Sequence, residues 1–161
     1  MSSRLQMEIN TQDTFNCPEE VAVLSILRTS DQLYNRFGRL FRKFDLTPSQ
    51  YNVLRVLRGE GKPIPCLEIA SRMIQVVPAI TGLIDRLESQ QLVQRKRAED
   101  DRRVIYVVLT RKGRQLVDKI DAPLVKLQQK IMKGISKTEL AETVRVLERV
   151  RDGIAASQDD E

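Results

Sequence analysis

The stretch LVQRKRAEDDRRVIYVVLT, residues 92–110, decides the fold of this chain. Residues 92–97 and 104–109 are rich in side chains that favour β-strands, and the charged residues 98–103 lie between them. We therefore predict two strands that the charged loop joins into a β-hairpin. Arg102 and Arg103 lie at or near the tip of this hairpin.

Two short helices are predicted directly before the hairpin. The segment at 67–73 places Leu67, Ala70 and either Met73 or Ile74 on one helical face. The second helix, over 78–89, carries an apolar stripe made of Ile80, Leu83, Ile84 and Leu87. Two short helices followed by a hairpin indicate a winged helix-turn-helix.

A capping box begins the helix before this pair. Thr47 and Gln50 have the spacing of the two reciprocal partners of such a box, and Pro48 suits the first helical position. Gly59 and Gly61 are expected to end this helix. With it, the predicted winged unit spans about 47–110.

Long amphipathic helices are predicted on both sides of the winged unit, over about 18–44 and 111–156. The second stretch holds two helices, because Ser136 and Glu139 form another capping box, and Pro123 is expected to kink the first of them. A winged unit is too small to cover such long apolar stripes. We therefore expect these dimerisation helices to bury against the same helices of a second chain, in a homodimer.

The fold class predicted is mainly α with a small β-hairpin wing. At 161 residues and 41% hydrophobic content, the chain suffices for one core. Residues 1–16 are polar and lack a sustained hydrophobic period, so we expect a flexible N-terminal arm. The remaining residues, 17–161, are predicted to form a single domain.

Positive charge is concentrated in the centre of the chain. The formal net charge is +5, and the sequence pI is near 9.4. Residues 72–114 contain ten Lys or Arg and five Asp or Glu, so this segment carries the whole net charge. A basic winged unit favours double-stranded DNA as the partner.

Several functional classes find no support in the residues. The chain has no histidine and only two cysteines, which argues against histidine-based catalysis, a His-containing zinc site and a disulfide framework. Glycine-rich phosphate loops, a nucleophile elbow and metal-ligand clusters are absent from the sequence, so we predict no catalytic residues, no metal, no cofactor and no enzyme. Lacking a long apolar run and a secretory signal, the chain is expected to be cytoplasmic and to contact no membrane.

Four motifs resemble the MarR family of bacterial regulators, over roughly residues 20–155. They are LTPSQY at 46–51, IASRM at 69–73, ITGLIDRLE at 80–88 and DDRRVIYVVLTRKG at 100–113. The wing signature of that family, Asp-x-Arg followed after five residues by Leu-Thr, is met by Asp101, Arg103 and the Leu-Thr pair at 109–110.

The resemblance implies a dimer that binds pseudo-palindromic DNA, usually as a repressor released by a small ligand or by oxidation. It makes 78–89 the recognition helix, with Asp85 also on its outer side. The predicted DNA-binding residues are Pro78, Ala79, Thr81, Gly82, Arg86, Arg95, Lys96, Arg97, Asp101, Arg102 and Arg103. Few of the helical residues have long polar side chains, so we expect phosphate contacts, the wing and DNA shape to contribute much of the recognition. A solvated charged turn is the alternative interpretation of the wing loop.

The family resemblance also suggests a ligand pocket between the dimerisation helices and the winged unit. Its possible lining residues are Tyr34, Phe37, Phe41, Tyr51 and Met73, for which plain core packing is the alternative. No cysteine lies in 21–44, so a peroxide sensor in the first long helix is not supported. Cys66 is interpreted as a packing residue, and the reactivity of Cys17 stays open.

Two functions are compatible with these features. The first is a sequence-specific DNA-binding transcriptional regulator, a repressor whose dimer is released from its operator by a small ligand. The second is a helical protein-interaction module that binds nucleic acid nonspecifically. Competition between a self-promoter fragment and random DNA separates the two.

Overall fold

The computed structural model describes residues 4–10, 15–75, 80–97 and 104–158. Two predicted DNA-binding sets, Pro78 with Ala79 and Asp101 with Arg102 and Arg103, lie outside these ranges. The chain forms two compact units, residues 1–122 and 123–161. Each unit is described by itself, and the prediction of a single domain over 17–161 stays a prediction.

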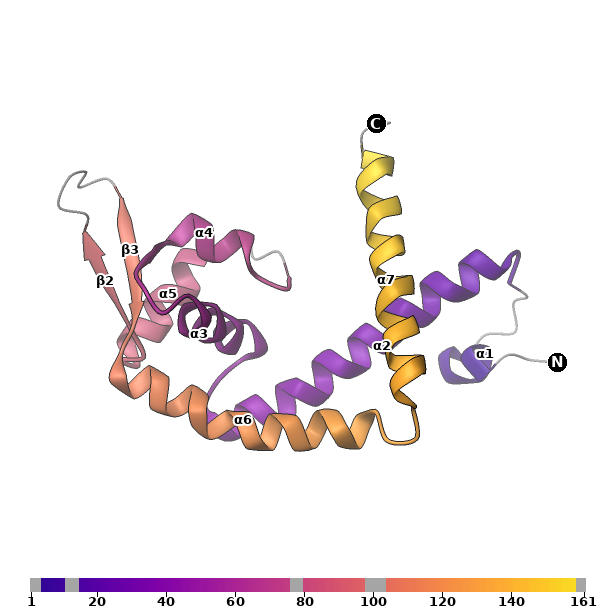
Figure 1. Cartoon of the computed structure of the whole chain (residues 1–161), viewed down its shortest axis with the longest axis horizontal. Helices are drawn as coiled ribbons and strands as arrows, with labels where there is room; N and C mark the ends of the chain where they lie inside the picture. Colours follow the sequence, from indigo (N-terminus) through magenta and orange to yellow (C-terminus); the bar gives the residue numbers. More distant parts are fainter. Residues whose placement is uncertain (1–3, 11–14, 76–79, 98–103, 159–161) are drawn as a thin grey trace. The chain divides into compact units, whose positions relative to one another are not determined.

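The order of elements is that of a winged helix-turn-helix with long helices on either side in the sequence (Figure 1). The first unit begins with α1 (Arg4–Ile9), α2 (Pro18–Phe41) and the 3₁₀ turn η1 (Arg42–Phe44). It continues with α3 (Pro48–Glu60), β1 (Ile64–Pro65), α4 (Cys66–Ser71), α5 (Ile80–Ser89), β2 (Val93–Arg97) and β3 (Ile105–Leu109). Helix α6 (Arg111–Ile131) begins in the first unit and continues through Pro123 into the second, which also contains α7 (Lys137–Gln158).

The predicted hairpin is confirmed, and a third strand joins it. Strands β2 and β3 pair antiparallel, with Val93 opposite Leu109 at one end and Arg97 opposite Ile105 at the other. The two-residue strand β1 pairs with the other edge of β3, so the strand order is β1-β3-β2. Strand β1 is not predicted from the sequence pattern.

Helix α3 begins and ends as its sequence predicts. The Thr47 side chain accepts a hydrogen bond from the Gln50 backbone N–H at 3.2 Å, and the Gln50 side chain accepts one from the Thr47 N–H at 2.9 Å. At the other end, Gly61 has a φ of 70°, a conformation that glycine adopts without steric cost.

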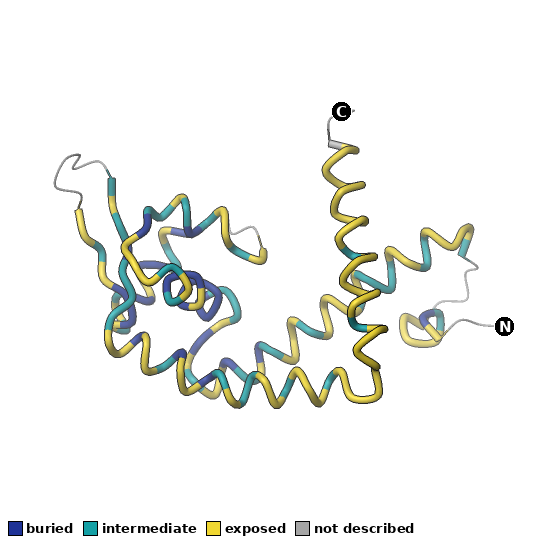
Figure 2. Tube along the Cα trace, viewed as in Figure 1, coloured by how far each residue is buried: buried dark blue, intermediate teal, exposed yellow. Residues whose placement is uncertain are grey.

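The core of the first unit surrounds α3 (Figure 2). Val53 and Leu54 of α3 are fully buried, as is Ile69 of α4. The other fully buried large side chains, at 2% exposure or less, include Leu57, Ile64, Ile84, Leu87, Val93, Val107, Val117 and Ile120. One core thus holds α3, α4, α5, the sheet and the start of α6 together.

The N-terminal arm differs from the prediction in part. Residues 4–9 form the short helix α1, in which Leu5 is buried and the Arg4 guanidinium pairs with Glu8 at 2.9 Å. A hydrophobic period is not detectable in six residues, so the local pattern does not predict this helix.

The second unit is largely exposed. The capping box before α7 is confirmed, because the Ser136 hydroxyl accepts from the Glu139 N–H at 3.2 Å and the Glu139 carboxylate accepts from the Ser136 N–H at 2.8 Å. Of the α7 residues whose burial the structure describes, 137–157, none is buried within the chain (Figure 2). Among the described residues, no helix has the length and apolar character needed to cross a membrane.

Candidate nucleic-acid interface

Helix α5 presents three faces, each made of residues spaced so that they share one side of a helix. The first face consists of Ile80, Ile84 and Leu87, which are buried where α5 packs on α3, α4 and β2. Leu83, which the sequence also assigned to this stripe, is half-buried. This face fixes α5 in the winged unit. The other two faces are free of this packing and have different contacts.

The second face of α5 is bridged by Arg95 of β2. The Arg95 Nη1 donates to Glu88 Oε2 at 2.7 Å, and Nη2 pairs with Asp85 Oδ1 at 2.6 Å and donates to the Thr81 carbonyl oxygen at 3.3 Å. The Arg95 backbone N–H also donates to Glu88 Oε1 at 2.8 Å, and this bond is the main reason that the pKa of Glu88 lies below its usual value. We call these contacts the Arg95 bridge. They occupy a residue that the sequence analysis assigned to DNA.

The third face of α5 is free within the described part of the chain. It contains Gly82, Arg86 and Ser89. Arg86 is exposed and forms no ion pair with any described residue, and a Cβ added at Gly82 has no atom within 4 Å. The Ser89 hydroxyl donates to the Arg86 carbonyl oxygen at 2.8 Å. Of the three faces, this one carries a long cationic side chain, and no described side chain blocks the approach of another molecule to it.

Strand β2 carries two further cations beside α5. Lys96 and Arg97 are exposed and, among the described residues, have no acidic partner. They contrast with Arg95, whose side chain is only 22% exposed. Lys96 and Arg97 are therefore available to phosphates, which bind such cations without regard to base sequence.

The base of the hairpin is held tightly against the start of α6. The Thr110 hydroxyl accepts from the Gly113 N–H at 3.0 Å and lies 3.0 Å from the Leu92 carbonyl oxygen. A Cβ at Gly113 would lie 2.1 Å from that same oxygen, so only glycine fits. Lys112 donates to the Gln90 carbonyl oxygen at 2.8 Å, which places its charge beyond the carboxyl end of α5.

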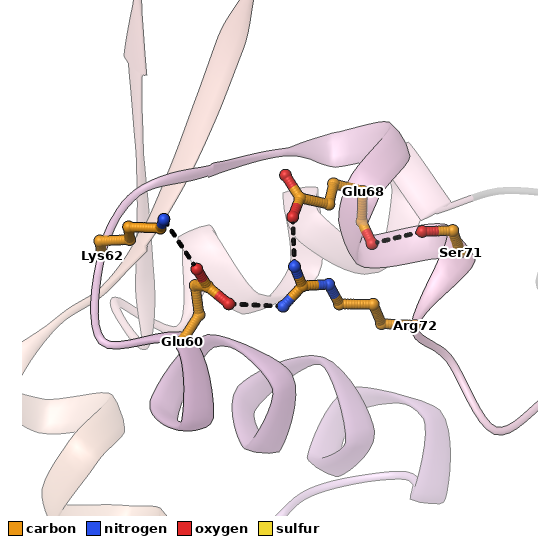
Figure 3. A network of polar contacts seen from close by, with 5 residues as sticks. All are labelled: Glu60, Lys62, Glu68, Ser71 and Arg72. Carbon is orange, nitrogen blue, oxygen red and sulfur yellow. Dashed lines mark hydrogen bonds and ion pairs between the residues drawn. The ribbon is translucent and has the colours of Figure 1, made fainter.

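A polar network joins the end of α3 to α4, as Figure 3 shows. Arg72 forms ion pairs with both Glu60 and Glu68, while Lys62 pairs with Glu60 at 3.1 Å. These cations, Arg72 first, lower the pKa of Glu60. The Ser71 hydroxyl donates to the Glu68 carbonyl oxygen at 2.9 Å. The network ties the first helix of the helix-turn-helix to α3 and uses Arg72 for structure.

Arg58 connects α3 to α6. Its guanidinium makes a bidentate contact with Asp121, at 2.7 and 2.9 Å, and a third bond to Asp118 at 3.1 Å. The hydrogen bond to Asp121 is the main cause of the raised pKa of Arg58. The bidentate geometry fixes orientation as well as distance between the two helices.

The predicted pocket residues lie partly in one aromatic column. The rings of Phe37 and Phe41 stack with centroids 6.4 Å apart, and those of Phe41 and Tyr51 stack at 4.3 Å. Phe41 and Tyr51 are buried, and burial raises the pKa of Tyr51. Tyr34 is 41% exposed and Met73 half-buried, outside these stacking contacts. A ligand pocket lined by these residues stays a prediction.

The two cysteines differ in their surroundings. Cys17 is exposed, whereas Cys66 is half-buried at the start of α4. Burial raises the pKa of the Cys66 thiol, and the nearby Arg95 guanidinium partly offsets that effect. Cys66 therefore remains a thiol at neutral pH, as a packing residue would. Within the described ranges, no group of three or more His, Cys, Asp or Glu side chains is placed to hold a metal ion.

Known proteins share both this sequence pattern and this fold. The family described as Transcriptional regulator SarA/Rot matches residues 36–120. A MarR transcription factor from Planctomyces limnophilus is 34% identical, with 84% of this chain and 98% of that chain covered and a TM-score of 0.65. BpsR from Bordetella bronchiseptica, whose DNA binding is regulated by 6-hydroxynicotinic acid, is 25% identical with a TM-score of 0.70, over 81% of this chain and 98% of that one. The HTH-type transcriptional repressor IacR of Pseudomonas putida is 29% identical over 125 residues, which are 78% of this chain and 74% of IacR.

Proposed function

The chain belongs to the MarR family of winged helix-turn-helix transcriptional regulators, and we propose that it represses transcription as a homodimer bound to a pseudo-palindromic operator. In this proposal α5 enters the major groove, and the loop at 98–103 reaches the minor groove with Arg102 and Arg103. We further propose that Asp101 holds Arg103 in position through a charge-assisted bond, both residues lying outside the described ranges. In this proposal the protein regulates transcription in the cytoplasm and catalyses no reaction.

One observation carries the proposal: the free face of α5 lies on the same winged unit as cations that have no acidic partner among the described residues. Gly82 and Arg86 are accessible on α5, and Lys96 and Arg97 are exposed on β2, the strand that packs against α5. A helix that is open to approach next to exposed cations fits a groove flanked by two phosphate backbones. Pro78, Ala79 and Thr81 are proposed to line the same groove.

The homodimer is supported by apolar side chains that the chain leaves in solvent. Val23 and Leu27 of α2 are 53% and 61% exposed, and Val144 and Ile154 of α7 are 55% and 54% exposed. Isolated helices with such stripes are stabilised by packing against another surface. We propose that residues 18–44 and 111–156 provide that surface in a second copy.

Release by a small ligand is proposed by comparison with BpsR, whose DNA binding is regulated by 6-hydroxynicotinic acid. Repression is proposed from relatives such as IacR, which is named a repressor. The site proposed for the ligand is lined by Tyr34, Phe37, Phe41, Tyr51 and Met73, where a ligand would touch both α2 and α3.

The decisive experiment is a footprint on the DNA upstream of the chain's own gene, with competition by random DNA at fixed salt. A symmetric protection pattern with half-sites about one helical turn apart, resistant to random competitor, is expected of a dimeric repressor. Equal competition by random DNA would contradict specific regulation and favour the interaction module with nonspecific binding.

A further inference from the structure

Arg95 has every feature of a residue committed to the protein rather than to DNA. Both of its Nη atoms are engaged, by Glu88 at 2.7 Å and by Asp85 at 2.6 Å, and its side chain is 22% exposed. Lys96, the next residue, is exposed and has no acidic partner among the described residues. The two cations therefore differ in role although the sequence places them side by side.

The Arg95 bridge connects the two parts of the winged unit that would touch DNA. Arg95 belongs to β2, whose far end begins the wing loop, while Thr81, Asp85 and Glu88 lie along one face of α5. Its contacts therefore span about two turns of α5, from Thr81 in the first turn to Glu88 near the end. Three acceptors at separate points along a helix, met by one planar guanidinium, fix orientation as well as separation.

The bridge also changes the charge that α5 presents. Asp85 and Glu88 are 59% and 37% exposed, and two carboxylates on a recognition helix repel phosphates. Arg95 lies between them and offsets this repulsion. The free face with Gly82 and Arg86 is thereby left as the approach to DNA.

We infer that Arg95 is a positioning residue, which sets the angle between the wing and α5 through Asp85, Glu88 and the Thr81 carbonyl oxygen, and does not itself bind phosphate. The inference rests on the proposed function, since it concerns how operator recognition is organised. It replaces the DNA-binding role predicted for Arg95 from the sequence.

The first test needs no DNA and therefore stands apart from the proposed function. Thermal unfolding of the full chain is measured at one protein concentration for wild type, R95K, D85N/E88Q and the combined triple variant. We expect R95K to lower Tm in the wild-type background and to change it little in the D85N/E88Q background, because the partners are then gone. Equal shifts in both backgrounds would show that Arg95 does not act through these carboxylates and would overturn the inference.

The second test measures operator and random-sequence duplex binding across a range of salt concentrations. R95K keeps the positive charge, so a phosphate contact would survive it, whereas a lysine cannot span the three acceptors. We expect R95K to misalign the wing and α5 and thereby to weaken operator binding by about tenfold, which corresponds to a loss of 1.4 kcal/mol in binding free energy. The salt slope should stay unchanged. The matched control K96A is expected to reduce the slope by about 0.9 per protomer. Wild-type affinity in R95K, together with a flattened slope in R95A, would refute positioning.

A third measurement compares the ratio of operator affinity to random-duplex affinity in wild type and in D85N/E88Q. The direction in which this ratio changes separates positioning from electrostatics, and the result does not depend on the stability of R95K. D85N/E88Q removes two negative charges and frees Arg95, so charge alone predicts tighter binding to every duplex. Positioning predicts tighter binding to random DNA but weaker binding to the operator, hence a lower specificity ratio. An unchanged or higher ratio would overturn the inference. If wild type prefers no duplex, the proposed function fails, and the unfolding cycle still decides whether the bridge acts as inferred.

Discussion

Replacing Gly82 with alanine is expected to stabilise the protein and to weaken its hold on DNA. A Cβ at this position meets no atom within 4 Å, so the methyl group enters open space in the free chain. Glycine in a helix is less favourable than alanine by roughly 0.5 to 1 kcal/mol, and no contact with the described residues repays that cost. For a chain of this size, G82A should raise Tm by about 1 to 4 °C.

The same methyl group has a different effect in the groove. If α5 approaches the bases over Gly82, an added methyl overpacks the contact, which typically costs about 1 to 3 kcal/mol. A loss of 1 kcal/mol at each of two half-sites is about 2 kcal/mol for the bound dimer, or about a thirtyfold loss in operator affinity. Gel shifts with the protected fragment, at one salt concentration, measure this effect.

Gly59 provides the matched control. It lies in α3, it is exposed, and a Cβ there also meets no atom within 4 Å. G59A should therefore raise Tm in the same way and leave operator affinity unchanged. Wild-type affinity in G82A, with the expected gain in Tm, would refute the argument that α5 approaches DNA over Gly82.

Four further outcomes are expected. G113A forces a Cβ to within 2.1 Å of the Leu92 carbonyl oxygen, so its free energy of unfolding in urea should fall by about 3 kcal/mol or more, and a loss below 1 kcal/mol would contradict the packing described. T47A removes a confirmed cap and should cost about 1 kcal/mol in the same assay, where no change would contradict the cap's contribution. Because the pKa of Glu88 is lowered from 4.5, its contribution to stability is present above that value and is lost as pH falls through the folded pKa. E88Q should thus lose less stability than wild type below about pH 4.5, and parallel pH curves would argue against this linkage. R103A should weaken operator binding while the dimer stays folded, and an unchanged gel shift at moderate salt would argue against the wing.

The features predicted correctly from the sequence are those that depend on residues close together in the chain. The Thr47 box, the end of α3 at Gly61 and the stripe of Ile80, Ile84 and Leu87 each depend on residues within a few positions of one another. Local rules cover such features because capping and helical periodicity act over one or two turns. The winged fold followed from their order.

The features that were missed depend on contacts between distant residues. Strand β1 has only Ile64 and Pro65, and its pairing with β3 across more than forty residues leaves no mark in the local pattern. Arg95 was assigned to phosphates because its neighbours are basic, whereas its partners lie on another element. The available signal was the spacing of Asp85 and Glu88 on one helical face, two carboxylates that require a cation if that helix is to approach DNA.

The strand order β1-β3-β2 has a practical consequence for handling the protein. Among the described residues, strand β2 pairs with another strand only on the side of β3, and on β2 the Arg95 N–H is bound by Glu88. The rest of the open edge is where a strand of another molecule can add. Lys96 and Arg97 are exposed on this strand, and charges there discourage such addition. The cations proposed to hold phosphates therefore also protect against aggregation. Variants meant to abolish DNA binding should carry glutamine or glutamate at these two positions, because valine or isoleucine would make the open edge of β2 prone to aggregation.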